Sequence, residues 1–384
     1  MKKIPYAHQY IDLSDINAVR RAVASDWLTQ GPRVKEFEEV LCGYTGAKYA
    51  VAVSSGTAAL HLAMMALEIG RGDETVTSPI TFSASANCAA YVGAVPRFAD
   101  IDDNTCHIDI EKLRYLLRDS RRSNKVKVVV PVHFTGSVSD IAAIRDICDK
   151  NGIKIVEDAA HAVGSTYKTG GKWVKVGSCR HSDVTIFSFH PIKNITTGEG
   201  GAVLTNDKKI YEKVSRLRHH GICRPENGPK WFYDIPQIGF NYRITDFQCA
   251  LGMSQMKKID KMIKIRREIV DTYNNAFSGV EEIRLPHEIK NTRTAYHLYV
   301  IRIPAGARNR LYDYLMRKGI LTQVNYIPVH LLTYYKKSFG YHMGDFPVAE
   351  KYFSECLSLP LYAGLSGQDQ KRVIKEIKRF FGYE

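Results

Sequence analysis

Lys193 lies in the stretch FSFHPIKNITTGEGG (residues 187–201), among small, polar and glycine residues. A lysine amine that loses its proton attacks an aldehyde and forms a Schiff base, and desolvation or a nearby cation favours that loss. The alternative is a solvated lysine in a surface loop, but strand-like segments flank this stretch on both sides. We therefore predict a reactive, Schiff-base-forming lysine at position 193.

Two carboxylates, Glu157 and Asp158, end the apolar run of IVEDAAHA (residues 155–162). An acid at the carboxyl end of a central strand faces the ligand crevice of an open α/β sheet. Placed against a pyridine nitrogen, Asp158 would keep that nitrogen protonated, so that the ring can take up electrons from a carbanion. His161 would hydrogen-bond Asp158 or a ring oxygen. The alternatives are a helix N-cap for Asp158 and a satisfied core histidine for His161.

The sequence SSGT (residues 54–57) follows an apolar strand-like run and opens a helical pattern. Backbone N–H groups at the start of a helix bind phosphate. Three residues there can add hydroxyl groups or a close backbone approach: Ser55, Gly56 and Thr57. Ser188 can reach the same phosphate. An N-cap with a tight turn is the alternative for SSGT alone, but the three motifs together predict an enzyme that uses pyridoxal phosphate.

Apolar strand-like runs alternate with amphipathic helical patterns over about the first 250 residues. The runs are residues 47–53, 74–80, 95–101, 126–134, 153–158, 183–189 and 200–206. This alternation predicts an α/β fold with a mostly parallel, seven-stranded sheet and helices on both faces. The reactive residues would then meet at the carboxyl ends of its strands.

The pattern changes near residue 244, where a long basic helical stretch begins. Strand-like runs at residues 296–303 and 321–327 and a final helical pattern follow. We predict a large cofactor-binding α/β domain with an N-terminal arm (residues 1–243) and a smaller α+β domain with a long connecting helix (residues 244–384). The long aromatic stretch at residues 222–239 is predicted to be a docked functional loop.

The composition limits the classes of function. The chain of 384 residues has a formal net charge of +14 and eight cysteines without zinc-ligand spacing, so we expect no metal site. Neither a signal peptide nor a membrane span is recognisable, and we expect a cytoplasmic, reduced protein. The charge raises the alternative of a nucleic-acid-binding protein, but the basic residues are spread along the chain and can equally steer a phosphate-bearing substrate. We expect neither nucleic acid nor a membrane as partner.

Long collinear blocks make the chain resemble the DegT/DnrJ/StrS family of nucleotide-sugar aminotransferases, which have the aspartate-aminotransferase fold (fold type I). The blocks are residues 27–38, 54–60, 78–87, 130–136, 157–165, 188–207 and 239–252. The resemblance implies pyridoxal phosphate as the cofactor. It also implies that Lys193 carries the cofactor and moves protons, and that Asp158 pairs with the pyridine nitrogen. Three residues would hold the phosphate: Gly56, Thr57 and Ser188.

The resemblance assigns further residues by position. Phe82 would stack on the pyridine ring, and Asn241 would reach across a homodimer interface to the partner's cofactor phosphate. Seven residues fall where the family binds the nucleotide sugar: Tyr6, Asp26, Trp27, Leu28, Thr29, Asn325 and Tyr326. No arginine clamp for the amino donor's carboxylate is recognisable, and Arg218 and Arg243 are the candidates.

Within the family, the chain most resembles the branch that makes pseudaminic acid. That branch transfers an amino group, expected to come from L-glutamate, to C4 of a UDP-linked 4-keto-6-deoxy-N-acetylhexosamine. The nearest alternative is the lipid A aminoarabinose branch, which shares similar stretches. The family's sugar dehydratases carry histidine at the position of Lys193, and a non-catalytic regulatory relative would lack one of the cofactor residues present here.

Overall fold

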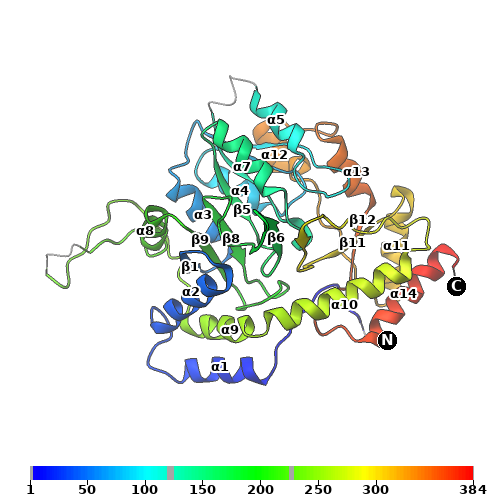
Figure 1. The fold of residues 1–384 in the computed structure, drawn as a ribbon, viewed down its shortest axis with the longest axis horizontal. Coiled ribbons are helices and arrows are strands. Elements are labelled where there is room, and N and C mark those ends of the chain that lie inside the picture. The colour runs from blue at the N-terminus through cyan, green and yellow to red at the C-terminus, as the bar shows by residue number, and fades with distance from the viewer. Residues whose placement is uncertain (1–2, 119–124, 225–228, 384) are drawn as a thin grey trace.

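The computed structural model describes residues 3–118, 125–224 and 229–383, and a seven-stranded sheet forms its centre (Figure 1). In sheet order the strands are β1 (Tyr49–Val53), β9 (Gly201–Thr205), β8 (Val184–Ser188), β5 (Lys154–Asp158), β4 (Val126–Val130), β2 (Glu74–Thr77) and β3 (Val95–Phe98). Within this sheet only β9 runs antiparallel to its neighbours. The predicted mostly parallel, seven-stranded sheet is confirmed.

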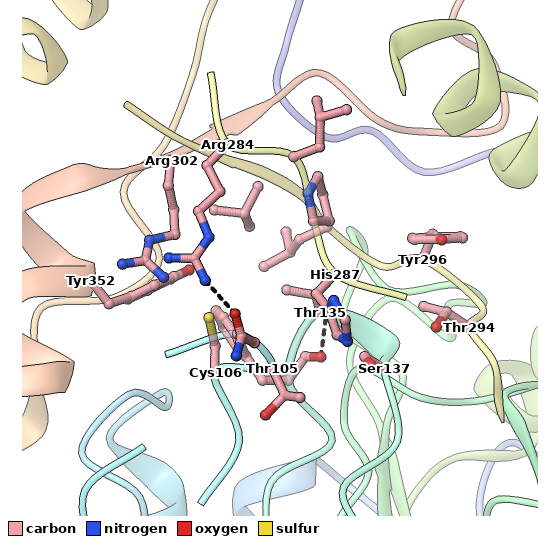
Figure 2. Close-up of a pocket in the computed structure, with 16 residues that line it drawn as sticks. Thr105, Cys106, Thr135, Ser137, Arg284, His287, Thr294, Tyr296, Arg302 and Tyr352 are labelled. Atoms are coloured by element: carbon pink, nitrogen blue, oxygen red, sulfur yellow. Dashed lines mark hydrogen bonds between the residues drawn. The ribbon is translucent and has the colours of Figure 1, made fainter. Parts of the chain in front are cut away.

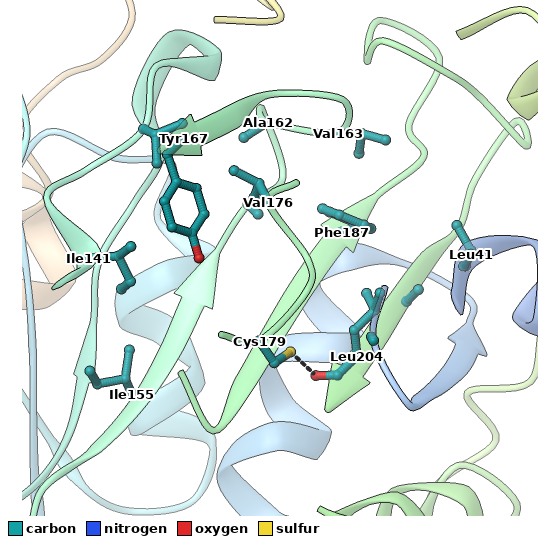
Figure 3. Close-up of a cluster of buried hydrophobic side chains, with 14 of the residues drawn as sticks. Leu41, Ile141, Ile155, Ala162, Val163, Tyr167, Val176, Cys179, Phe187 and Leu204 are labelled. Atoms are coloured by element: carbon teal, nitrogen blue, oxygen red, sulfur yellow. Dashed lines mark hydrogen bonds between the residues drawn. The ribbon is translucent and has the colours of Figure 1, made fainter. Parts of the chain in front are cut away.

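Helices cover both faces of the sheet because its strands are apolar on both faces. One face packs against α2 (Pro32–Thr45), α5 (Ile110–Arg118) and α7 (Ile141–Lys150), and the other against α3 (Gly56–Ala66), α4 (Ala84–Tyr91) and α8 (Lys208–Leu217). Adjacent residues of β5 point to opposite cores, Ile155 to the first and Val156 to the second. Figure 3 shows the first core, where Ile155 and Phe187 of the strands lie with Ile141 of α7.

The C-terminal part packs beside the sheet along a long helical connection (Figure 1). Its elements are α9 (Asp246–Met256), α10 (Ile259–Phe277), β11 (Tyr299–Arg302), α11 (Ala305–Arg317), η2 (Val329–Leu331), α12 (Thr333–Phe339), α13 (Pro347–Glu355), β12 (Cys356–Leu359) and α14 (Gly367–Phe381). Strands β11 and β12 pair antiparallel, and a separate core around Tyr273 and Leu311 lies between them and the helices. Residue Ile4 of the N-terminal arm enters this core, and the domain boundary at residue 243 stays a prediction.

Smaller elements complete the described chain. They are α1 (Leu13–Val23), which packs on α9, the short helix η1 (Phe134–Gly136), and a three-stranded sheet of β10 (Thr292–Arg293), β6 (Thr166–Thr169) and β7 (Lys172–Lys175). No helix in the described part of the chain is long and apolar enough to cross a membrane.

The strand predicted at residues 321–327 is absent, and that prediction is wrong. Only Gln323 forms a bridge, with Ser358 of β12. Beyond it, the Asn325 side chain accepts a hydrogen bond from the Ser358 hydroxyl at 2.7 Å, and the Asn325 carbonyl accepts one from Tyr352. These bonds replace a strand ladder and turn the segment towards a cavity described below.

The aromatic stretch at residues 222–239 projects away from the body of the chain in its described parts (Figure 1, the green extension beside α8). Trp231 and Ile238 are 77% and 78% exposed, and Tyr233 is also exposed. These side chains do not dock within one chain, and the predicted docking of a functional loop stays a prediction. Large apolar side chains held this far out of the core are typical of a protein interface.

Glu157 is a buried carboxylate beneath the carboxyl end of the sheet, adjacent in sequence to Asp158. It accepts hydrogen bonds from His133 Nε2 at 2.6 Å and from Thr185 at 3.0 Å, and a further one from Ser182. Burial alone would raise the pKa of Glu157, but the bonds from His133 and the two hydroxyls hold it below its ordinary value. This network ties together the ends of β4, β5 and β8.

We predict that Glu157→Ala lowers the free energy of unfolding by about 3–5 kcal/mol, because it leaves buried polar partners without their acceptor. Chemical denaturation at fixed protein concentration measures the change. The control is Glu39→Ala, which removes an exposed partner of Lys35 at 3.8 Å and should cost less than about 1 kcal/mol. Equal stabilities of the two variants would contradict the role given to the network.

Candidate active site

A cavity of about 620 Å³ opens at the carboxyl ends of β5 and β8, where the start of α3 and the segment around residue 325 meet them. It collects residues predicted from widely separated motifs: Tyr6, Ser55, Gly56, Thr57, Phe82, Asp158, His161, Ser188, Lys193, Asn325 and Tyr326. Side chains from both parts of the chain thus surround one site. Strand ends of an open α/β sheet are the place where such folds bind ligands.

Lys193 lies in the turn after β8, where its backbone N–H donates to the His190 carbonyl at 2.9 Å. Burial of the amine lowers the pKa of Lys193 to about 8, and the nearby negative charge of Asp158 offsets part of this effect. A substantial fraction of the amine is therefore neutral near physiological pH, as a nucleophile must be.

Asp158 ends β5 and is 5% exposed. One of its oxygens, Oδ2, accepts a hydrogen bond from the Ser85 hydroxyl at 2.5 Å, and the other, Oδ1, accepts one from the Ala160 N–H at 3.1 Å. The backbone of Asp158 pairs with residues on both sides of Val132. The carboxylate is thus fixed in position within the cavity wall.

His161 faces the same cavity. Its Nε2 lies 3.2 Å from the Tyr326 hydroxyl, and its ring centroid lies 4.3 Å from that of His297. Burial, together with the charge of Lys193, keeps the pKa of His161 well below its ordinary value, so the ring is neutral. Its buried Nδ1 has no partner among the described residues and is available to a bound ligand.

The helix start at α3 forms a narrow cradle. The Ser55 side chain caps the helix by accepting from the Ala58 N–H at 3.0 Å, so the N-cap interpretation holds for this hydroxyl. A Cβ atom on Gly56 would lie 2.9 Å from Cβ of Ser188, and one on Gly201 would lie 2.5 Å from the backbone of Ser55. The close approach of the helix start to β8 and β9 therefore requires glycine at both positions. This approach brings the free N–H groups of the first helical turn to the cavity.

Phe82 is 59% exposed above the cavity, and its ring centroid lies 6.1 Å from that of Tyr326. An exposed aromatic ring beside a cavity is available to cover a planar ligand. Tyr6 and Asn325 complete the wall on the side of the C-terminal part. Burial raises the pKa of Tyr6, so its hydroxyl remains a neutral donor.

Five predicted residues lie outside this cavity: Asp26, Trp27, Leu28, Thr29 and Asn241. Trp27 and Leu28 are more than half exposed, and Thr29 forms a bridge with Thr245. Asn241 is exposed and forms a bridge with His219. The roles predicted for these five residues, with that of Asn241 at a partner subunit's cofactor, stay predictions.

The two arginine candidates for the donor carboxylate also lie outside the cavity. Arg218 binds the Glu38 carboxylate at 2.5 Å and the Ala52 carbonyl, so its charge is already compensated. Arg243 donates to His219 Nδ1 at 2.8 Å. Among the described residues that line the cavity there is no arginine.

Sequence reasoning missed several residues that lie at this site. His190, Glu199 and Gln323 line the cavity, and Ser85 and His297 contact Asp158 and His161. Ser85 lies within the 78–87 block, in the first turn of α4, and Thr81 precedes that helix; the block is the signal that points to Ser85. His297 comes from a distant segment and carries no comparable local signal.

A second, smaller cavity of about 50 Å³ lies between the two parts of the chain (Figure 2). Arg284 and Arg302 point into this region and both bind Asp103, at 2.6 Å each. Burial opposes ionisation of Asp103, but the two guanidinium groups lower its pKa to about 2. The charged side chains at this cavity are paired, and the cavity has room for only a few water molecules. These ion pairs hold the two parts of the chain together, and the cavity is too small for a sugar nucleotide.

The residues of the main cavity fit pyridoxal phosphate. The helix start and Ser188 suit its phosphate, Asp158 suits the pyridine nitrogen, the unpartnered Nδ1 of His161 suits the ring oxygen, and Lys193 suits the aldehyde. The fold and this cavity define a pyridoxal-phosphate-dependent aminotransferase of fold type I.

Residues 9–378 match the DegT/DnrJ/EryC1/StrS aminotransferase family, and the chain belongs to that family. It is 40% identical to the spore coat polysaccharide biosynthesis protein SpsC of Bacillus subtilis (strain 168), over 98% of this chain and 96% of the relative. It is 38% identical to the UDP-4-amino-4,6-dideoxy-N-acetyl-beta-L-altrosamine transaminase of Campylobacter jejuni (serotype O:23/36, strain 81-176), over 96% and 95% of the two chains.

Solved structures show the same fold. Helicobacter pylori PseC, an aminotransferase involved in the biosynthesis of pseudoaminic acid, superposes with a TM-score of 0.90 at 31% identity, covering 99% of both chains. The PLP-form of Spr1654 from Streptococcus pneumoniae has a TM-score of 0.90 at 32% identity, covering 99% of this chain and 98% of the other. The predicted family, fold type and cofactor are confirmed. The protein is a sugar aminotransferase that uses pyridoxal phosphate.

Proposed function

We propose that this enzyme transfers an amino group from an amino acid, L-glutamate, to C4 of a UDP-linked 4-keto-6-deoxy-N-acetylhexosamine. The observation that carries the proposal is the cavity in which Lys193, with its lowered pKa, faces Asp158 beside a helix start. The names of the Campylobacter and Helicobacter relatives support the choice of sugar. SpsC, at 40% identity, supports a role in making a polysaccharide precursor.

Each residue of the cavity has a defined task in this proposal. Pyridoxal phosphate, when bound, supplies a ring that stores the electron pair left by a departing proton. Lys193 would hold the cofactor covalently and, once released, would move the proton between substrate and cofactor carbons. Asp158 fixes the charge at the pyridine nitrogen, and Phe82 covers the ring face. The phosphate is held by Gly56, Thr57 and Ser188.

The two substrates share this cavity in turn. The amino acid would give up its amino group and leave as its 2-keto acid. The sugar ketone would then take up that group and lose its oxygen as water, so the kinetics should be ping-pong. Tyr6, Asn325 and Tyr326 lie where the nucleotide sugar would enter. All eight cysteines are free thiols, which supports placing the enzyme in the reducing cytoplasm.

The test is incubation of the holoenzyme with L-glutamate and a panel of UDP-4-keto sugars, with the product identified by mass spectrometry and NMR. We expect amination at C4 of the 4-keto-6-deoxy-N-acetylhexosamine and little product from the UDP-4-keto-pentose of the lipid A aminoarabinose type. Preference for the pentose would replace the proposed substrate by the second candidate. Absence of amination with every sugar in the panel would overturn the proposal.

The neutral amine of Lys193 predicts a pH dependence for cofactor uptake. Below its pKa of about 8, the neutral fraction falls about tenfold for each pH unit, and above it the fraction is constant. The rate at which apoenzyme gains the cofactor's visible absorbance should follow this curve. Asp158→Asn removes a charge that raises the pKa of Lys193, so its curve should move to lower pH. A flat rate between pH 6 and 9 would contradict the assignment.

A homodimer with shared sites is part of the proposal. The exposed aromatic loop offers an apolar interface, and the cavity of one chain contains no arginine among its described residues. A second copy would bring Asn241 to the cofactor phosphate and Asp26 to Thr29 to the nucleotide sugar. The arrangement leaves Lys193 and Asn241 of one site on different chains.

Mixing inactive variants tests this arrangement. We predict that Lys193→Ala and Asn241→Ala dimers, each weakly active or inactive alone, regain about a quarter of the wild-type rate after subunit exchange. Half of the dimers are then mixed, and each mixed dimer holds one complete site. The control mixes Lys193→Ala dimers with dimers of the double variant that carries both Lys193→Ala and Asn241→Ala. This mixture should restore no activity. No recovery from the single variants would place Asn241 in its own chain's site.

A further inference from the structure

The aspartate at the cavity wall is held by a short chain of hydroxyl groups. The Ser85 hydroxyl donates to Asp158 Oδ2 at 2.5 Å, and the Thr81 hydroxyl lies 2.6 Å from that of Ser85. Ser85 is fully buried and Thr81 is 2% exposed. Water is therefore excluded from the chain, and each hydroxyl depends on the next for its hydrogen bond.

The direction of these bonds follows from the number of protons. Ser85 has one hydroxyl proton, and its alternative acceptor, the Phe82 carbonyl, lies farther away at 3.3 Å. The proton therefore goes to the carboxylate, where a hydrogen bond to a charged oxygen is strongest. The Ser85 oxygen then accepts the proton of Thr81. The two donors act in series on a single oxygen of Asp158.

A hydrogen bond donated to a carboxylate stabilises its charged form and weakens its hold on a further proton. An aspartate and a pyridine nitrogen compete for one proton. Donation by Ser85 should therefore leave that proton on the ring nitrogen, which is the state that stores electrons. The same short segment carries Phe82, so the residue over the ring and the donors to the acid beneath it move as one unit.

We propose that Ser85, supported by Thr81, is a positioning residue that acts through Asp158 to keep the ring nitrogen of the cofactor protonated. This inference rests on the proposed role of Asp158. It extends that role to Ser85, which does not line the cavity, and to Thr81, which lies at its wall. It also explains why a serine and a threonine are buried at this point rather than apolar residues.

The direct readout is the ¹⁵N NMR chemical shift of pyridoxal phosphate labelled at its ring nitrogen and bound to the holoenzyme. We expect the wild-type enzyme to show a protonated nitrogen and Asp158→Asn a neutral one. Ser85→Ala should move the shift towards the neutral value. Thr81→Val, which keeps the shape but removes the outer donor, should move it by a smaller amount. Ser83→Ala is the control, because Ser83 makes no side-chain cap bond and does not line the cavity.

Kinetics give a second readout. Ser85→Ala should lower kcat by roughly tenfold, while KM for the sugar changes by less than about twofold. Ser85→Thr, which restores the donor, should recover most of the loss. If the wild-type enzyme and Asp158→Asn show the same ¹⁵N shift, the role of Asp158 fails. If Asp158→Asn changes the shift while Ser85→Ala and Thr81→Val leave it at the wild-type value, the proposal for Ser85 is overturned and the role of Asp158 stands.

Discussion

Lys193→Ala should abolish transamination, with a loss in kcat of about 10⁴-fold or more, because one amine both holds the cofactor and moves the proton. Alanine leaves the cavity otherwise intact, so the cofactor should still bind through the helix start of α3 and through Asp158. The visible absorbance of the covalently held cofactor should disappear. Enzyme assays with glutamate and the UDP-4-keto sugar, together with absorption spectra, measure both effects.

Two comparisons separate this loss from a general effect on the fold. Lys208→Ala removes a lysine that is largely exposed and paired with Glu212 at the surface, and it should keep the wild-type rate. A small primary amine added to Lys193→Ala should restore part of the rate, because it can move the proton in place of the side chain. A Lys193→Ala enzyme that turns over at the wild-type rate would remove the lysine from the mechanism.

Asp158→Asn should lower kcat by roughly 10²–10³-fold, because it replaces a buried charge with a neutral group of the same shape. Asparagine has the same shape, and its amide oxygen can keep one of the two hydrogen bonds that the Asp158 carboxylate accepts from Ser85 and Ala160. Its amide cannot stabilise a proton on the pyridine nitrogen as a carboxylate does. The loss should persist when the cofactor is saturating.

The matched control for this variant is Asp140→Asn, which alters an aspartate that caps α7 away from the cavity. It should leave kcat within about twofold of the wild-type value. A near-normal rate for Asp158→Asn would show that the ring nitrogen needs no charged partner here. Loss of cofactor affinity alone, with full kcat at saturation, would likewise contradict the electronic role.

The sheet could be predicted from the sequence because its strands are buried on both faces and therefore form continuous apolar runs. The short strands β6 and β7 were missed because they are half-exposed, as Trp173 shows at 44% exposure. The segment at residues 321–327 has a strand-like composition, but the bonds of Asn325 to Ser358 and Tyr352 prevent a regular ladder. Local pattern cannot anticipate such long-range partners.

The residues of the site could be predicted where a single sequence motif supplies a single function. Asp158 ends a strand, and Lys193 and the helix start at Gly56 each follow one. The topology of the sheet brings these strand ends together. Ser85 is 73 residues from Asp158 in the chain, so their contact depends on how α4 packs against the sheet, on β2 and β3. The roles proposed for Asn241 and Trp27 involve a second chain, and no pattern within one sequence can predict where that chain lies.

Reduction of the purified, cofactor-loaded enzyme with borohydride, followed by peptide mass spectrometry, tests the covalent attachment most directly. We predict that the reduced cofactor is found on the peptide that contains residue 193, on that lysine alone, and that prior incubation with glutamate largely prevents the labelling. Label on another lysine, or a chain that takes up cofactor but yields no labelled peptide, would contradict the account.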